Sequence, residues 1–179
     1  MNSLPLHPAV VHLPLALAIL MPLVAGGLTW AIWTGRARPG AWFSVVLLQA
    51  LLLGSGLFAI NTGGAEEERV EGIVQEGVLH QHEESAEQFV WVSGATLALA
   101  ALVLVIRRPA ASRSIAAAVV VATVAVAGLG FRVGRAGGQL VYVHGAASAY
   151  SSTASATSPD PTRTGDRHEG RDAHEARER

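Results

Sequence analysis

The sequence contains no cysteine and no lysine, and few of its 179 residues are charged. Without cysteine the chain forms no disulfide, no thiolate metal site, no cysteine-ligated iron–sulfur cluster and no covalently attached c-type haem. Only 15% of the residues are charged, whereas 50% are hydrophobic, which is too little charge to cover the surface of a soluble domain. The net charge of −1 provides no overall basic field, so the composition does not favour nucleic acid as a partner.

The common signatures of enzymes are also missing from the sequence. The chain has no HExxH zinc motif, no phosphate-binding loop, and no recognisable nucleophile–base pair or pair of catalytic carboxylates. An enzyme is therefore not favoured, and no catalytic residue is assigned.

The hydrophobic residues are gathered into four blocks of roughly membrane-spanning length. About 20 helical residues cover the ~30 Å hydrocarbon core, and a segment in lipid must satisfy its own backbone hydrogen bonds. The sequence therefore predicts an all-α protein, an integral membrane four-helix bundle formed by a domain of residues 1–147. The predicted membrane helices span approximately residues 9–33, 41–60, 89–106 and 115–131.

Two segments outside these blocks have a different composition. Between the second and third blocks, Val70, Ile73, Val74 and Val78 form one helical stripe, which predicts an amphipathic extramembrane helix over about residues 65–81 with an acidic polar face. From Ser148 onward the chain has no Val, Leu, Ile or Phe, so residues 148–179 are predicted to be a disordered polar tail.

Arginines near the ends of the helices predict the orientation in the membrane. The first and third connections together carry five arginines, whereas Arg69, Arg132 and Arg135 fall on the other side. By the positive-inside rule, the protein is predicted to be a multi-pass protein of the cell membrane with both termini on the extracytoplasmic side. The five cytoplasmic arginines are then Arg36, Arg38, Arg107, Arg108 and Arg113.

This topology places five of the seven histidines on one side of the membrane, near the ends of the helices. Neutral imidazole is the commonest metal ligand, carboxylates complete zinc or non-haem iron sites, and two histidines on different helices can hold a haem b. The predicted metal ligands are His12, His82 and His144, with His7 and Glu83 as auxiliaries. The alternative is that these histidines are structural and hydrogen-bond to loop carbonyls and glutamates.

Two functions follow from these alternatives. The first is electron transfer through a haem b or a divalent metal ion at the outer face, with a redox or other membrane protein as partner. The second is a non-catalytic accessory subunit that docks a partner through its acidic outer loop. A transporter is less favoured, because Gln49 is the only strongly polar residue well inside the predicted spans and there is no intramembrane carboxylate relay.

Small and aromatic residues indicate how the helices pack. Gly130, Gly134 and Gly138 recur at four-residue spacing, which favours close packing within the bundle over homodimerisation, although the oligomeric state stays open. Gln49 is expected to make a hydrogen bond to another helix. The tryptophans expected to anchor the helices at the membrane interface are Trp30, Trp33, Trp42 and Trp91.

The two ends of this domain carry motifs that resemble a known family. "LHPAVVHLPLAL" and "GGQLVYVHG" are similar to the opening and closing motifs of the bacterial predicted membrane proteins called domain of unknown function 2231. The resemblance covers residues 6 to about 147, with Leu13 where the family usually has Phe and "AAS" where it tends to have V-G-V. It implies four membrane helices and no assigned activity, and because some relatives are joined to cytochrome-type domains it favours redox chemistry. The positions that match the motifs and are expected to be structural are Pro8, Pro14, Gly137, Gly138, Tyr142 and Gly145.

Overall fold

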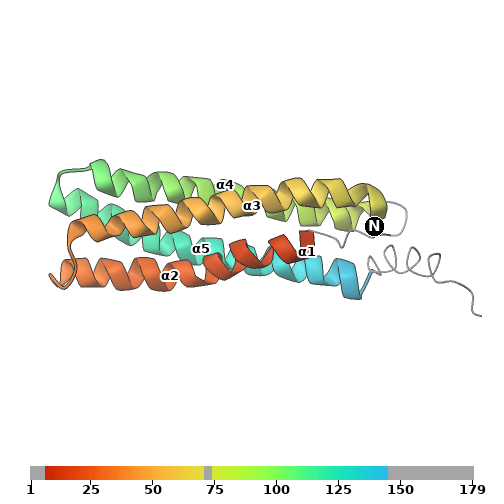
Figure 1. Cartoon of the computed structure of the whole chain (residues 1–179), viewed down its shortest axis with the longest axis horizontal. Helices are drawn as coiled ribbons and strands as arrows, with labels where there is room; N and C mark the ends of the chain where they lie inside the picture. The colour runs from red at the N-terminus through yellow and green to blue at the C-terminus, as the bar shows by residue number, and fades with distance from the viewer. Residues whose placement is uncertain (1–6, 71–73, 145–179) are drawn as a thin grey trace, which may run out of the picture. The chain divides into compact units, whose positions relative to one another are not determined.

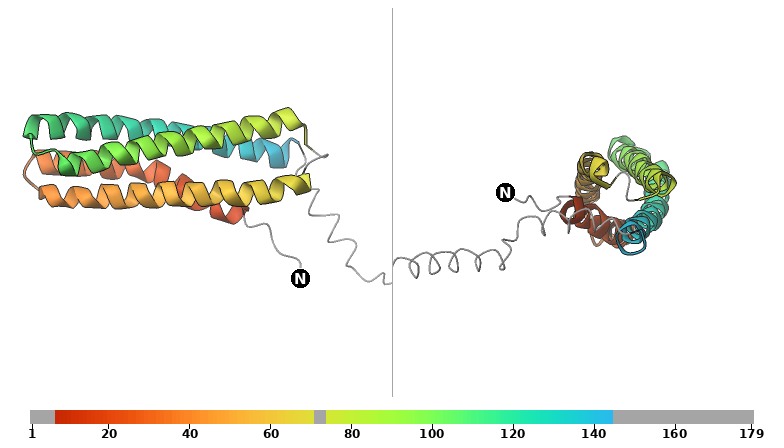
Figure 2. Two further views of the ribbon diagram at one scale, coloured as in Figure 1. Left: turned by 90° about the horizontal axis from the view of Figure 1, so that it is seen from above. Right: turned by 90° about the vertical axis from the view of Figure 1, so that its right-hand side faces the viewer.

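The computed structural model describes residues 7–70 and 74–144, and it describes side chains within 9–64 and 74–144. Four long helices run alternately in opposite directions (Figure 1). Seen end-on in Figure 2 they surround a common centre, with α2 and α4 each packed against both α3 and α5. The elements are α1 (His7–Val10), α2 (His12–Trp33), the 3-10 helix η1 (Pro39–Trp42), α3 (Phe43–Val70), α4 (Glu76–Val105) and α5 (Pro109–Tyr142).

Each of the four long helices is long and apolar enough to cross a membrane. This confirms the prediction of an all-α, four-helix, multi-pass membrane protein. The spans are His12–Trp33, Pro39–Gly64, Glu76–Val105 and Pro109–Tyr142.

Three of the helices extend well beyond the hydrocarbon region. At ~1.5 Å per residue, the 30 residues of α4 and the 34 residues of α5 are about 45 and 51 Å long, whereas the hydrocarbon core is about 30 Å thick. The polar residues lie on the excess turns at one end, formed by the end of α3, the start of α4 and the end of α5. We call this the histidine end, because His80, His82 and His144 lie there, and the opposite end the arginine end.

The segment between the second and third spans differs from the separate surface helix expected over 65–81. Residues 65–70 continue α3, and α4 already begins at Glu76. The apolar stripe is used for packing within the bundle: Val74 and Leu140 are buried against each other, with Val78 and Leu79 alongside. Residues 71–73 and the predicted tail 148–179 lie outside the described part of the chain.

A proline explains why the first helical segment is divided. Pro14 has no N–H to donate to the carbonyl of Val10, and the regular helix is interrupted at Val11 although that residue keeps helical dihedral angles. The next amide, that of Leu15, bonds the Val11 carbonyl at 3.3 Å, and α2 continues from His12.

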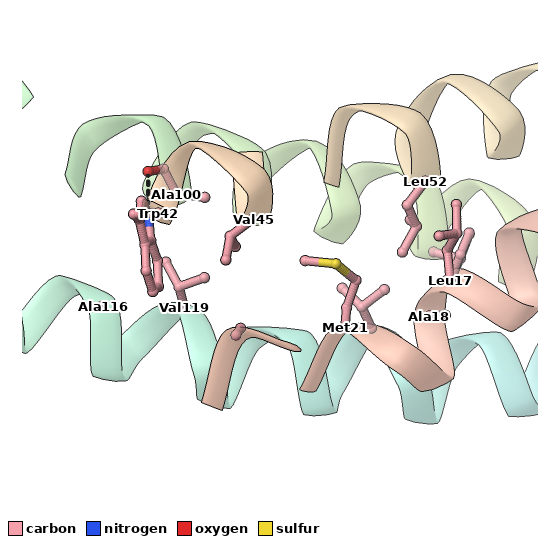
Figure 3. Packing of buried hydrophobic residues seen from close by; sticks show 12 residues of the cluster. Leu17, Ala18, Met21, Trp42, Val45, Leu52, Ala100, Ala116 and Val119 are labelled. Carbon is pink, nitrogen blue, oxygen red and sulfur yellow. Dashed lines mark hydrogen bonds between the residues drawn. The ribbon is translucent and has the colours of Figure 1, made fainter. Parts of the chain in front are cut away.

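One of the expected interface tryptophans lies in the core instead. Trp30, Trp33 and Trp91 are exposed to the surroundings of the bundle, as anchors should be. Trp42 is only 2% exposed, and its indole Nε1–H donates to the carbonyl of Ala100 at 3.0 Å (Figure 3). A buried indole needs such a partner, and this bond ties the start of α3 to α4.

Among the described glycines, the tightest contacts are with rings, and two of them are with the ring of Phe89. A Cβ atom built on Gly130 would lie 3.3 Å from Phe89, and one built on Gly56 would also lie 3.3 Å from it. The methyl group of Ala18 is 3.5 Å from the same position on Gly130. Helix association in lipid depends on such close contact, because lipid tails are as apolar as the side chains and the hydrophobic effect between helices is lost.

One seven-residue step from this aromatic layer toward the arginine end, the interior becomes polar. Moving seven residues along each helix from Phe89, Gly56 and Gly130 places Thr96 level with Gln49 and Thr123. The side chains of all three are at most 1% exposed. Gln49 makes the expected interhelical bond, from its Nε2 to the Ser93 carbonyl at 3.2 Å. Its Oε1 is buried without a hydrogen-bond partner in the structure.

The layer at Phe89 predicts a position-specific effect of added volume. Gly130→Val should lower the free energy of unfolding by about 1–3 kcal/mol, because the new side chain meets Phe89, Ala18 and Leu15. Gly128→Val is the matched control, since nothing lies within 4 Å of a Cβ at Gly128, and it should change stability by less than ~0.5 kcal/mol. Equilibrium unfolding in mixed detergent measures both variants, and equal losses would contradict this packing.

The polar layer predicts an unusually mild effect at a fully buried polar residue. Gln49→Leu removes one hydrogen bond to Ser93, and interhelical bonds of this kind contribute ~0.6 kcal/mol on average. It also removes a buried acceptor that has no partner, which offsets the loss. The same unfolding measurement should therefore place this variant within about 1 kcal/mol of the parent protein, and a loss above ~2 kcal/mol would show that Oε1 is satisfied after all.

Candidate functional site

The residues predicted to bind metal lie at the histidine end, but the structure does not bring them all together. They come from four places in the chain: α1, the start of α2, the first turns of α4 and the residues just after α5. Among the residues described, no three His, Asp or Glu side chains are grouped as a metal ion would require. The side chain of His7 is outside the described set, so the auxiliary role predicted for it is untested.

His82 is the histidine that the bundle holds most closely. Its imidazole is half-buried, and its Cε1 atom would lie 3.3 Å from a Cβ built on Gly137 of α5. His82 precedes Phe89 by seven residues, and Gly137 follows Gly130 by seven, so this pair repeats the ring-against-glycine contact of the aromatic layer one step further out. The glycine of the closing motif therefore leaves the space that the imidazole occupies.

His12 has a different environment, although it also lies near the histidine end. It is the first residue of α2 and its side chain is exposed, while the adjacent turn buries Pro14 and packs Leu15 against Gly134. The residues that face the bundle are thus two and three positions further along the helix. His12 therefore lacks the half-buried position that His82 has.

Glu83, predicted as an auxiliary metal ligand, contacts His80, which was not among the predicted ligands. Its Oε2 lies 3.9 Å from Nδ1 of His80, three residues earlier on the same helix, and this His80 side chain is 79% exposed. Because neighbouring residues of a helix point about 100° apart, Glu83 does not share the face of His82. The pair is a solvent-exposed contact at the surface of α4.

His144 lies at the C-terminal cap of α5. Its backbone N–H and that of Val143 both donate to the Gln139 carbonyl, at 3.1 and 2.9 Å, and the residue is half-buried. It follows Gly137 by seven residues, about two helical turns or ~10 Å along the axis, so it is not level with His82.

The residues expected to be structural differ in how closely they pack within the bundle. Gly137 receives the His82 ring, and Pro14 is buried where the first helix is interrupted. A Cβ on Gly138 would meet nothing within 4 Å, so the close-packed glycines of α5 are Gly130 and Gly137, with Gly134 against Leu15. The Tyr142 side chain is 89% exposed. The side chain of Pro8 and the whole of Gly145 lie outside the described set.

A family model identifies what kind of protein has this architecture. The model of a predicted membrane protein family, DUF2231, matches residues 3–149, which include both motif segments and all four spans. The chain belongs to this family. The DUF2231 match agrees with the four-helix membrane fold, and the family description assigns no activity. Neither the curated proteins nor the solved structures include one that matches the chain.

The contact of His82 with Gly137 predicts that two adjacent glycines of this DUF2231 protein respond differently to substitution. Gly137→Val should displace the His82 imidazole, because the added atoms occupy its present position, and Gly138→Val should leave it in place. Nitrogen-15 NMR of histidine-labelled protein reports the ring environment. A shift of the His82 resonances in the Gly138 variant, or none in the Gly137 variant, would contradict the described contact.

Proposed function

We propose that this membrane protein binds a haem b or a divalent metal ion at the histidine end and uses it in electron transfer, with the His82 imidazole as the principal ligand. The observation that carries the proposal is the position of His82. On the same helix, two residues apart, His80 is exposed on the surface, whereas His82 is half-buried against Gly137 of the facing helix. Bundle-facing side chains on opposing helices are the usual source of cofactor ligands in four-helix proteins.

The surroundings of His82 suit this chemistry. The side chain lies on the first turns of α4, before the apolar run that begins at Phe89. A metal ion or haem can therefore reach it without entering the hydrocarbon core. The ring packs against Gly137 on one side, and a neutral imidazole can bind a metal through either nitrogen.

The second ligand is proposed from the remaining histidines of this end. Haem b needs only two axial ligands, so a group of three is not required. His144 is half-buried just after α5, about two turns beyond the level of His82, and His7 lies in α1, which packs against α3. His12 is a less suitable partner because its side chain is exposed in the present arrangement.

A second candidate function is supported by the acidic surface of α4. Glu76, Glu84 and Glu87 are exposed, and none of the three makes an ion pair with another described residue. Carboxylates left available in this way suit docking of a basic partner protein, and the chain would then be a non-catalytic accessory subunit.

The proposal predicts a difference between two neighbouring histidines. The full-length protein, purified in mild detergent, should show a Soret band that shifts on reduction, or a stoichiometric metal by elemental analysis. His82→Ala should abolish the signal, because it removes the ligand held inside the bundle. His80→Ala is the matched control and should retain it, since that side chain is 79% exposed.

The other outcomes separate the two candidate functions. A folded protein that carries neither haem nor metal, and gains neither when supplied with haemin or with Zn²⁺ or Fe²⁺, would overturn the proposal. Co-purification of a basic protein, lost on combined substitution of Glu76, Glu84 and Glu87 by Gln, would then support the accessory function. Equal loss of signal in the His80 and His82 variants would show that the ligand is not specific to the bundle-facing ring.

A further inference from the structure

Among the described residues, the arginine end of the bundle carries cations without a carboxylate near them. The sequence has no Asp or Glu in residues 1–65 or 88–159. The four glutamates whose side chains the structure describes all lie at the opposite end: Glu76, Glu83, Glu84 and Glu87. Five arginines are exposed at the arginine end: Arg36, Arg38, Arg107, Arg108 and Arg113.

The first of these arginines is fixed by a helix cap. After Trp33, the Gly35 N–H bonds the Ile32 carbonyl at 3.1 Å and the Arg36 N–H bonds the Ala31 carbonyl at 2.7 Å, which is the Schellman arrangement. Gly35 has φ +73°, a conformation that L residues rarely adopt. The turn brings the Arg36 guanidinium over the Trp30 ring, with Cζ 4.7 Å from its centroid.

The second group of arginines lies at the same end of the molecule. Arg107 and Arg108 form the extended connection between α4 and α5, and Pro109 begins the next helix. The bond from Trp42 to the Ala100 carbonyl holds η1, which directly follows Arg38, against the last turns of α4. Figure 1 shows both connections at one end of the bundle.

We propose that the arginine end binds the headgroups of anionic phospholipids. Guanidinium groups pair with phosphate through two parallel hydrogen bonds and are less strongly hydrated than ammonium groups, and this chain has arginine in place of lysine throughout. The occupant is a lipid because the cations border apolar surface: Trp30, Trp33 and Val105 are 57%, 47% and 73% exposed beside them. A headgroup on the arginines leaves its acyl chains along this surface.

The inference does not depend on which side of the membrane the arginine end faces, nor on the proposed metal centre. It requires only a bilayer leaflet that contains anionic lipid. Basic residues near a membrane surface each add to the attraction of such lipids, and the attraction falls with salt.

Lipid-dependent thermal unfolding of the full-length chain in mild detergent tests the proposal. Phosphatidylglycerol should raise the unfolding temperature at a concentration at least about tenfold lower than phosphatidylcholine with the same acyl chains. In the variant Arg36→Gln/Arg38→Gln/Arg107→Gln/Arg108→Gln, phosphatidylglycerol and phosphatidylcholine should raise the unfolding temperature at similar concentrations. The matched control is Arg132→Gln/Arg135→Gln, two exposed arginines near the histidine end, and it should keep the preference.

Three results would overturn the proposal. The first is that the parent protein responds equally to the two lipids, and the second is that the fourfold variant keeps its preference for phosphatidylglycerol. The third is that the control variant loses that preference as much as the fourfold variant does. Inorganic phosphate at matched concentration should have no effect, and stabilisation by it would instead identify a site for free anions. If the fourfold variant is not recovered folded, the pairs Arg36/Arg38 and Arg107/Arg108 are changed separately, and each should lower the preference by several-fold.

Discussion

The packing of rings against glycines is the constraint on which the rest of this bundle depends. In lipid, two apolar helices gain little by moving out of contact with acyl chains, so they associate where their surfaces fit closely. Phe89 makes one such close fit: it faces Gly56 of α3 and Gly130 of α5 and so fixes the height of three helices relative to one another. The same seven-residue step carries that register in both directions along the bundle.

The candidate site inherits its geometry from this register. His82 is one step from Phe89 on α4, and Gly137 is one step from Gly130 on α5, so the imidazole meets the glycine because the aromatic layer has set the level. A slide of α5 by one turn would bring a different side chain against the ring. The placement of His82 therefore follows from the apolar packing next to it and not from local contacts between polar groups. The neighbouring His80 lies on the outer face of the same helix and has no comparable environment.

Much of the fold was predictable from the sequence, whereas the site was predictable only in part. Hydrophobic blocks of membrane length gave the four helices, and the isolated polar residue Gln49 gave an interhelical hydrogen bond. The helices α3, α4 and α5 continue past the predicted membrane segments through polar turns, where composition no longer distinguishes helix from loop. The pairing of His82 with Gly137 could have been found from the shared spacing of seven between His82 and Phe89 and between Gly130 and Gly137. The direction of His12 could not, because the break at Val11 changes which face of the first turn meets the bundle.

The interior also explains how the two polar ends can coexist with a stable membrane domain. Between them, the hydroxyls of Ser93, Thr96 and Thr123 each donate to a carbonyl of their own helix, at 2.7 Å in every case, so these buried groups need no partner across the bundle. Gln49 makes a hydrogen bond between helices at this level, from its Nε2 to the Ser93 carbonyl. A polar layer whose members are mostly satisfied within their own helices adds little to the association of the four helices. The register therefore rests on the aromatic layer at Phe89 and on the Trp42 anchor near the arginine end, one on each side of the polar layer, and each end is positioned by the tight contact nearest to it.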